Sequence, residues 1–273
     1  MKRGRAPLSQ NFLMDANIAR KIVAALTVPE AVPVVEIGPG RGILTRELVK
    51  RFPQVVAVEV DPLLANQLPE LLGHPDNLQT LHHDFLQISL KELAQSLHTS
   101  SLAIIGNLPY HLTSPILFKL LDHSGLLTRA VVMVQKEVAE RLVAKPGNKQ
   151  YGILSVQVQY FCRVEYLFTV PARVFRPQPQ VDSAVVKLAF RPREHRRAID
   201  EALFRKIVRG TFAQRRKMIR NTLSNLFSSA ILENLNFDLT RRPESFSVDE
   251  FVELSNVIYQ RLPKDHGAHD QRN

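Results

Sequence analysis

Five short apolar runs between residues 34 and 134 alternate with segments of helical periodicity, and this alternation restricts the possible folds more than any other feature. Each run has the length of a buried strand, and each intervening segment is long enough for a crossover helix. Such a chain forms a doubly wound, mostly parallel sheet with helices on its faces. The sequence therefore predicts an α/β fold. The predicted strands are Val34–Ile37, Val55–Val60, Leu78–Leu81, Leu102–Gly106 and Ala130–Val134.

Helices are predicted before, between and after these strands, and two further strands follow them. Residues 151–161 fit a helix or a strand, so both interpretations stay open at this stage. Val164–Val170 and Ser183–Phe190 are predicted as strands. The predicted helices run from an Asp15 cap to about Leu26, from Ile43 to Arg51, from Leu63 to Leu72, from Ser89 to Leu97, and onward from Ser114-Pro115.

Polar residues and glycines stand at the carboxyl ends of four predicted strands. Ligands bind beyond the carboxyl ends of the strands in open parallel sheets. Because these ends meet at one edge of the sheet, we expect the residues to line one rim. They are Gly38, Gly40, Glu59, Asp84 and Asn107.

Three of these features together indicate an adenosine-containing cofactor. The turn Gly38-x-Gly40-x-Gly42 follows a strand and lets a ligand approach the backbone, although such turns are also common as plain structure. Glu59 stands where an acid binds ribose hydroxyls. Asp84 suits an adenine amine or a helix cap. This acid-rich rim has no phosphate-binding lysine of the G-K-[ST] type, which favours S-adenosylmethionine.

The segment Asn107-Leu108-Pro109-Tyr110 directly follows the fourth predicted strand. The Asn107 amide offers an acceptor oxygen, and proline keeps the backbone of Leu108 extended with its carbonyl outside any helix. Tyr110 offers a flat aromatic face, although it is equally well explained as a core aromatic. Two acceptors and a ring are suited to hold the exocyclic amine of a planar base, so Asn107, Leu108, Pro109 and Tyr110 are the candidate catalytic residues.

The C-terminal third loses strand character and gains a strongly basic segment. The whole chain has a formal net charge of +10, which favours a polyanionic partner such as nucleic acid. Residues 205–220 carry seven basic side chains and no acid. On a continuous helix, six of the seven share one face of about 120°, with Arg215 as the exception. We expect this face to bind RNA phosphates rather than a membrane, through Arg205, Arg209, Arg216, Lys217 and Arg220.

Several functional classes are disfavoured by composition. A single cysteine, Cys162, allows neither an internal disulfide nor a cysteine zinc site, and we expect no metal. The basic N-terminus lacks the apolar segment of a signal peptide, and no run reaches the length of a membrane span. We therefore expect a cytoplasmic protein that does not use a membrane.

The chain resembles the KsgA-type family of ribosomal RNA small-subunit adenine dimethyltransferases. The resemblance runs in family order over nearly the whole chain, and its last two motifs favour the small-subunit enzymes over the related Erm-type enzymes. The matching motifs are Gln10-Asn11-Phe12-Leu13, Val35-Glu36-Ile37-Gly38-Pro39-Gly40, Gly106-Asn107-Leu108-Pro109-Tyr110, 135–142, 175–184 and 212–221.

This resemblance implies a class I, Rossmann-like methyltransferase fold with S-adenosylmethionine as cofactor. It implies dimethylation of the N6 amine of adenine in 16S ribosomal RNA during ribosome biogenesis. Asn11 and Leu13 would close over the methionine part of the cofactor, with Gly38 beneath it. Phe175 would cover the target base opposite Tyr110. The cofactor-binding set is Asn11, Leu13, Gly38, Gly40, Glu59, Asp84 and Asn107.

The expected organisation is a catalytic domain at 1–190, whose residues 1–28 form an N-terminal arm and helix, and a helical RNA-binding domain at 191–273. We expect a monomer whose partner is ribosomal RNA within an immature small subunit. Three alternatives remain: an Erm-type 23S ribosomal RNA methyltransferase, a DNA adenine methyltransferase, and a non-catalytic RNA-binding or transcription factor on the same fold.

Overall fold

The computed structural model of this chain describes residues 11–195, 197–233 and 235–263. The chain divides into two compact units, residues 1–143 with 158–195 and residues 144–157 with 196–273. The expected boundary at residue 191 differs from this division mainly at 144–157, which belongs to the helical unit. Hydrogen bonds explain the difference, because Gly147 N donates to the Glu244 carbonyl at 2.8 Å. Residues 1–10 of the expected N-terminal arm lie outside the described residues.

The larger unit is built on a seven-stranded sheet of order β4-β3-β2-β5-β6-β9-β7. The first five strands in this order are parallel, as the sequence predicts. The strand order reverses at β2, which pairs with β3 on one side and with β5 on the other. Their bounds lie within two residues of the prediction, except that β6 begins three residues earlier. The strands are β2 (Val34–Ile37), β3 (Val55–Glu59), β4 (Leu78–His82), β5 (Leu102–Asn107), β6 (Leu127–Gln135), β7 (Cys162–Val170) and β9 (Ser183–Phe190).

Strand β9 lies between β6 and β7 and is antiparallel to both. Ser183 opens this strand and pairs with Gln135 of β6 on one side and with Val170 of β7 on the other. The last strand of the unit in sequence is therefore an interior strand of the sheet.

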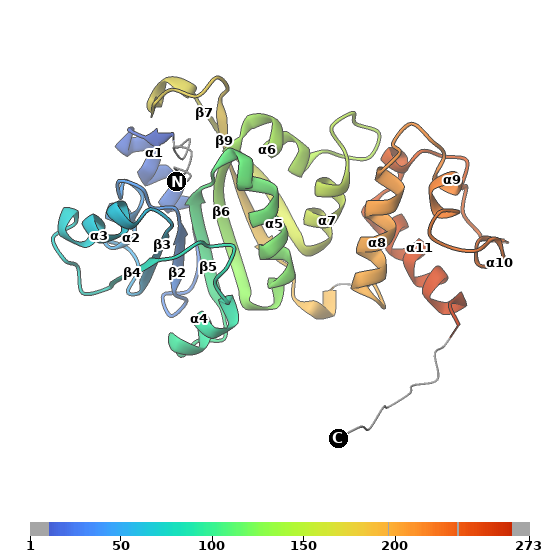
Figure 1. Cartoon of the computed structure of the whole chain (residues 1–273), viewed down its shortest axis with the longest axis horizontal. Helices are drawn as coiled ribbons and strands as arrows, with labels where there is room; N and C mark the ends of the chain where they lie inside the picture. The colour runs from blue at the N-terminus through green and yellow to red at the C-terminus, as the bar shows by residue number, and fades with distance from the viewer. Residues whose placement is uncertain (1–10, 196, 234, 264–273) are drawn as a thin grey trace, which may run out of the picture. The chain divides into compact units, whose positions relative to one another are not determined.

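Helices cover both faces of the sheet, as its doubly wound pattern requires (Figure 1). Buried residues of α1 and α2, such as Ile22 and Leu48, share a core with inward residues of β2, β3, β5 and β6. In Figure 1, α5 crosses in front of β5 and β6. Helix α2 is shorter than predicted. The helices of this unit are α1 (Ala16–Ala25), α2 (Thr45–Leu48), α3 (Pro62–Leu71), α4 (Leu90–Ser96), α5 (Thr113–Asp122) and α6 (Lys136–Val143).

A separate two-stranded ribbon joins the N-terminal segment to a distant part of the chain. Strand β1 (Phe12–Leu13) pairs antiparallel with β8 (Phe175–Arg176), and Leu13 is opposite Phe175. Met14 N extends the pairing by donating to the Val174 carbonyl at 2.9 Å. This ribbon fixes the position of Asn11, the first described residue.

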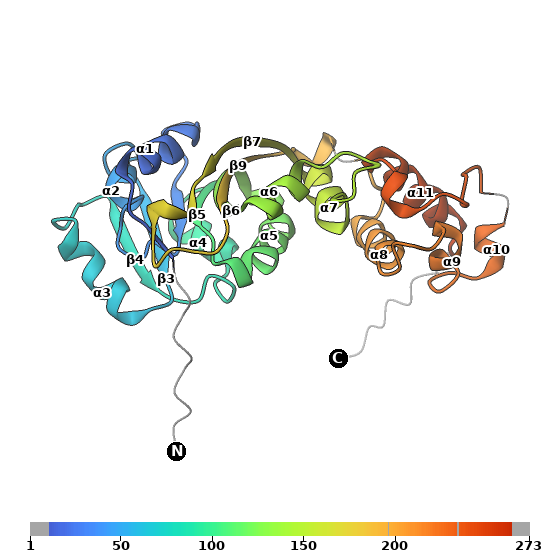
Figure 2. The same cartoon turned by 90° about the horizontal axis from the view of Figure 1, so that it is seen from above.

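The smaller unit is helical and has an aromatic core. Tyr151, Phe212, Phe246 and Phe251 form a chain of ring contacts with centroids 5.5–6.2 Å apart. Residues 151–161, which fitted a helix or a strand, form mainly the helix α7 (Ile153–Phe161), and the first part of α7 belongs to this unit. The other helices of the unit, seen in Figure 2, are α8 (Glu201–Phe212), α9 (Ile219–Leu223), α10 (Ser229–Leu232) and α11 (Val248–Arg261).

The structure contradicts the expectation of one continuous helix through residues 205–220. Helix α8 ends at Phe212, and the chain turns before α9 begins at Ile219. Tertiary hydrogen bonds replace helical ones here, because Ile219 N donates to the Arg241 carbonyl at 2.8 Å and Arg220 N to the Leu239 carbonyl at 3.0 Å. The basic side chains therefore do not form one helical stripe.

In the described part of the chain, no helix combines the length and the apolar character needed to cross a membrane.

Candidate active site

The residues expected at one rim do line one pocket. Gly38, Gly40, Glu59, Asp84 and Asn107 all border the same cavity, beyond the carboxyl ends of β2, β3, β4 and β5. The cavity lies where the strand order reverses, which is the usual ligand position in doubly wound sheets. Its other lining residues include Asn11, Leu13, Leu108, Pro109 and Tyr110.

The glycine turn has a backbone that side chains rarely adopt. Gly38 and Gly40 have φ angles of 63° and 55°. A Cβ at Gly40 would also lie 2.9 Å from the ring of Phe12. The turn therefore requires glycine both for its conformation and for the close approach of β1.

Glu59 organises this turn as well as lining the pocket. Its side chain is only 2% exposed, and its carboxylate accepts three backbone N–H groups. Gly40 N donates to Oε2 at 3.0 Å, and the N–H groups of Val60 and Asp61 donate to Oε1 at 2.9 and 3.0 Å. A carboxylate has about four acceptor positions, so capacity remains for a ligand hydroxyl.

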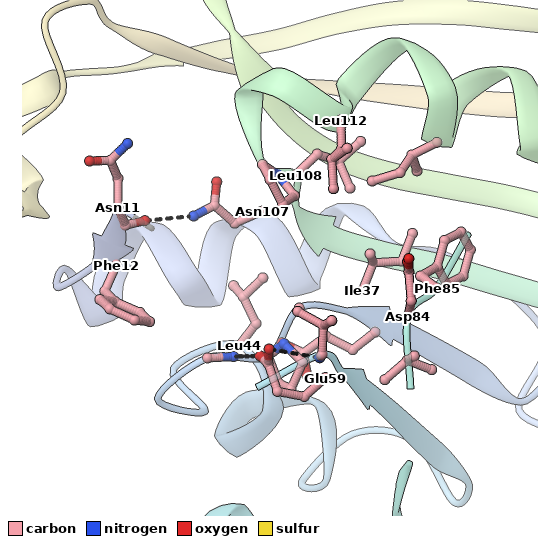
Figure 3. Close-up of a pocket in the computed structure, with 18 of the residues that line it drawn as sticks. Asn11, Phe12, Ile37, Leu44, Glu59, Asp84, Phe85, Asn107, Leu108 and Leu112 are labelled. Atoms are coloured by element: carbon pink, nitrogen blue, oxygen red, sulfur yellow. Dashed lines mark hydrogen bonds between the residues drawn. The ribbon is translucent and has the colours of Figure 1, made fainter. Parts of the chain in front are cut away.

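Asn107 has a fixed orientation. Its Nδ2 donates to the Asn11 carbonyl at 3.0 Å, which Figure 3 shows as a dashed line toward the N-terminal segment. A carbonyl can only accept, so the amide nitrogen must point toward Asn11 and Oδ1 must point elsewhere. Oδ1 therefore remains available as an acceptor.

The backbone after Asn107 leaves one carbonyl for a ligand. The Pro109 carbonyl accepts from Leu112 N at 3.0 Å and from the Thr113 hydroxyl at 3.2 Å. Within the described residues, no hydrogen bond uses the Leu108 carbonyl. Leu108 N is held by the Met133 carbonyl at 3.0 Å. The Leu108 carbonyl is therefore a better candidate acceptor for a ligand than the Pro109 carbonyl.

The loop after β4 is held in place by a residue that the sequence analysis did not select. Asp84 accepts from Leu86 N at 2.9 Å, which forms a local turn. Lys119 of α5 reaches this loop, donates to the Leu86 carbonyl at 3.0 Å and to the Ile88 carbonyl, and lies 5.5 Å from the centroid of the Phe85 ring. Partial burial lowers the pKa of Lys119, and nearby Asp84 opposes that shift. The sequence feature that could have identified Lys119 is its position as a single lysine within an otherwise largely apolar helix.

Tyr110 borders the pocket from the 3-10 turn η1 (Tyr110–Leu112). Its ring is half-buried, and its hydroxyl lies 2.9 Å from Ser183 Oγ. Burial raises the pKa of Tyr110 above its ordinary value, the Ser183 contact opposes this shift, and Asp182 adds to it. Tyr110 is therefore a neutral phenol whose polar end is occupied.

Phe175, expected to cover the target base, does not line the pocket in this structure. Its side chain has no exposed surface, and it packs with Leu13 in the hydrophobic core rather than lining the pocket. The pairing of β8 with β1 turns this ring inward. Sequence reasoning could place Phe175 near the site but could not show which way its ring points.

Glu36 is a second buried acid in the pocket. It is 1% exposed, and its Oε2 has no hydrogen-bond partner among the described residues. Burial is the main cause that raises its pKa to about 8, the Thr45 hydroxyl opposes the shift, and Glu59 adds to it. An acid within an otherwise apolar strand was the signal in the sequence.

The proposed RNA-binding side chains lie in the smaller unit at surface positions. Arg209, Arg216, Lys217 and Arg220 are exposed, and Arg205 is partly exposed. Arg215 has a structural role instead, because its guanidinium donates to the Lys149 and Tyr151 carbonyls, each at 2.8 Å. Among the residues that the structure describes, no group of three His, Cys, Asp or Glu residues has a metal-binding arrangement.

The profile of a family described as ribosomal RNA adenine dimethylase matches residues 1–260. The chain belongs to the ribosomal RNA adenine dimethylase family. Among its dimethylase relatives, the ribosomal RNA small subunit methyltransferase A of Bacillus cytotoxicus is 43% identical, over 92% of this chain and 90% of that protein. The protein of the same name from Bacillus mycoides is 42% identical over the same shares.

Solved structures agree with the dimethylase fold. A dimethyladenosine transferase from Plasmodium falciparum has a TM-score of 0.75 at 24% identity, covering 89% of this chain and 95% of that chain. The 23S rRNA methyltransferase ErmE has a TM-score of 0.69 at 26% identity, covering 92% and 100%. The expected class I methyltransferase fold is therefore confirmed for this dimethylase.

Proposed function

We propose that this chain transfers methyl groups from S-adenosylmethionine to the N6 amine of adenine in small-subunit (16S) ribosomal RNA, twice per base. One observation carries the proposal: the glycine turn, Glu59 and Asp84 border the same pocket as Asn107 and Tyr110. The residues proposed to bind the donor and those proposed to bind the base therefore line one cavity. The small-subunit substrate is supported by the relatives named ribosomal RNA small subunit methyltransferase A.

The pocket residues fit S-adenosylmethionine, which supplies a methyl group on a positively charged sulfonium. Three acids, Glu36, Glu59 and Asp84, line the pocket, and Arg41 is the single Lys or Arg among its described lining residues. The unpartnered Oε2 of Glu36 leaves a buried polar atom that a ligand could contact. Glu59 would hold the ribose hydroxyls and Asp84 the adenine amine, with Asn11, Leu13 and Gly38 beside the methionine part.

At the mouth of the pocket, the chain would act mainly by positioning the target amine. The lone pair of an aromatic amine is delocalised into its ring, so the amine is a weak nucleophile. Asn107 Oδ1 and the Leu108 carbonyl would accept its two hydrogens and direct the lone pair toward the donor. The bond from Asn107 to Asn11 holds this acceptor in place. Positioning and fixed dipoles account for the rate gain, without a general base.

The target base must leave its stack to reach these acceptors. Tyr110 would then stack on it, a contact worth about 1–3 kcal/mol in comparable proteins. Arg205, Arg209, Arg216, Lys217 and Arg220 would hold the RNA backbone. An immature small subunit as partner, a monomeric state and a cytoplasmic location remain predictions.

The decisive experiment maps N6,N6-dimethyladenine in small-subunit ribosomal RNA from cells with and without this protein, and in vitro with the purified chain. We expect Asn107→Ala to lower transfer by about 10²–10³-fold, because a fixed acceptor at the reacting amine is lost. Affinity for S-adenosylhomocysteine should change little. Asn107→Asp keeps an acceptor but adds a charge, so intermediate activity is expected.

The same assay separates the alternatives. Transfer to 23S RNA instead of small-subunit RNA would favour an Erm-type enzyme, and transfer to naked DNA would favour a DNA methyltransferase. Calorimetry that detects no cofactor binding would favour a non-catalytic RNA-binding protein. Wild-type turnover by Asn107→Ala would remove Asn107 from the mechanism.

A further inference from the structure

Stacking on a target base requires that the ring of Tyr110 keep one orientation. Tyr110 stands at the start of the short turn η1, directly after Pro109, and its ring is only half-buried. Two rotatable bonds connect the ring to the backbone. Packing alone therefore does not fix the orientation of the Tyr110 ring. The hydrogen bond of its hydroxyl is needed to do so.

That contact reaches β9, a strand that is paired on both sides. The Tyr110 hydroxyl lies 2.9 Å from Ser183 Oγ, a partner 73 residues away in sequence. Ser183 has no exposed surface and is paired on both sides, with Gln135 and with Val170. The hydroxyl of Tyr110 is thus tied to an interior strand.

The residue before Ser183 is also fixed. The Asp182 carbonyl accepts from Lys136 N at 3.0 Å, and its carboxylate accepts from Ala172 N at 2.9 Å. Ser183 Oγ makes no other hydrogen bond within the described residues, so each of the two hydroxyls depends on the other. Either one can be the donor.

We propose that Ser183 is a positioning residue for methyl transfer, which holds the ring of Tyr110 against the target base through this hydroxyl pair. The inference rests on the proposed function. Ser183 touches neither the base nor the donor and acts only through Tyr110. It also occupies the phenol, so the part of Tyr110 that matters for transfer is its ring face.

A double-mutant cycle tests this assignment. Ser183→Ala and Tyr110→Phe should each lower kcat on small-subunit ribosomal RNA about fivefold, the loss of one ordinary hydrogen bond. The double variant should be no slower than either single variant, because both remove the same contact. The proposal would be overturned if the loss of kcat in the double variant equalled the product of the two single losses. It would also be overturned if Ser183→Ala had the wild-type kcat.

A matched control separates positioning from general destabilisation. Ser255→Ala removes another buried hydroxyl, which bonds the Val252 carbonyl at 2.8 Å on α11. We expect a similar drop in melting temperature for Ser255→Ala and Ser183→Ala, but a lower kcat only for the latter. Equal kcat losses in the two variants would assign Ser183 a structural role.

Two further measurements keep the test informative. If Ser183→Ala does not fold, Tyr110→Phe at a half-buried position still decides, since a wild-type rate there would refute the need for the hydroxyl. Wild-type transfer to ribosomal RNA is measured first. Absent wild-type transfer would count against the proposed function, whereas an active wild type with unaffected variants would count against this inference alone.

Discussion

At the scale of single residues, the pocket holds two buried glutamates whose carboxyl groups differ in their hydrogen-bond partners. Glu59 accepts hydrogen bonds from three backbone N–H groups. Glu36 lacks a hydrogen-bond partner for Oε2 among the described residues, and burial raises its pKa to about 8. The two side chains share one pocket, but among the described residues only Glu59 accepts hydrogen bonds from backbone N–H groups.

This contrast predicts how stability depends on pH. The folded-state pKa of Glu36 lies above its ordinary value of 4.5, so folded protein binds more protons than unfolded protein between about pH 5 and 8. The Glu36 contribution to the free energy of unfolding should therefore fall as pH rises through this window. Glu36→Gln removes that contribution, so its melting temperature should fall less between pH 5 and 8 than that of the wild type.

The measurement is thermal unfolding of both proteins in the absence of cofactor, at half-unit steps of pH. Glu30→Gln is a suitable control, because Glu30 is exposed and outside this pocket. Parallel curves for wild type and Glu36→Gln would contradict the assignment.

The sequence could identify those site residues whose positions follow from the strand order, but not those whose positions depend on long-range contacts. Glu59, Asp84 and Asn107 were predictable because the carboxyl ends of parallel strands meet at one edge. The ring of Phe175 lies in the core here, and its direction could not be foreseen because it depends on the pairing of β8 with β1. The contact of Ser183 with Tyr110 could not be predicted, because the two residues are 73 positions apart in the sequence.

At the scale of elements, the cofactor pocket depends on a helix that contributes mainly support. Lys119 extends from α5 to two carbonyls of the loop 84–88, and this loop carries Asp84 and Phe85 into the pocket. Hydrogen bonds from a charged donor are stronger than neutral ones. The loop is therefore ordered before a ligand arrives, which reduces the entropic cost of binding.

We predict that Lys119→Met weakens binding of S-adenosylhomocysteine about tenfold, because the ligand must then order the loop itself. The kcat at saturating cofactor should change less than twofold. Calorimetry gives the affinity, and initial rates give kcat. Lys91→Met, at an exposed lysine of α4, should alter neither. Unchanged affinity in Lys119→Met would show that the loop is ordered without this lysine.

Helix boundaries in the smaller unit show where local pattern fails. The sequence of residues 205–220 favours one helix throughout, yet α8 ends at Phe212. Arg215 turns toward the Lys149 and Tyr151 carbonyls, and Ile219 N pairs with the Arg241 carbonyl. These partners are distant in sequence, so no local periodicity could predict them.

At the scale of the whole molecule, the acids of the pocket and the basic side chains proposed to bind RNA lie in different units. The pocket of the larger unit contains three acids, and the smaller unit presents the exposed basic side chains at 209, 216, 217 and 220. The net charge of +10 therefore coexists with an acidic site. A cationic donor and a polyanionic substrate would each find a region of opposite charge.

This division predicts that RNA affinity and donor affinity can be changed separately. Arg216→Ala with Lys217→Ala should weaken binding of small-subunit ribosomal RNA, and should reduce the slope of log affinity against log salt by about one to two units. Affinity for S-adenosylhomocysteine should stay unchanged. Filter binding at several salt concentrations measures the slope.

A charge-matched control is Arg46→Ala with Lys91→Ala, two exposed positions of the larger unit. The same loss of salt dependence in this control would indicate a diffuse charge effect rather than a contact made by residues 216 and 217.

The interior position of β9 also has a consequence for biosynthesis. Among the described strands, β7 joins the sheet only through β9, so β7 has no partner until residues 183–190 have left the ribosome. The same strand brings Ser183 to Tyr110. A nascent chain that ends before residue 183 already contains Glu59, Asp84 and Asn107 but lacks Ser183, the proposed support for the ring of Tyr110. The site would thus mature in two stages during translation, the donor end first and the base end last.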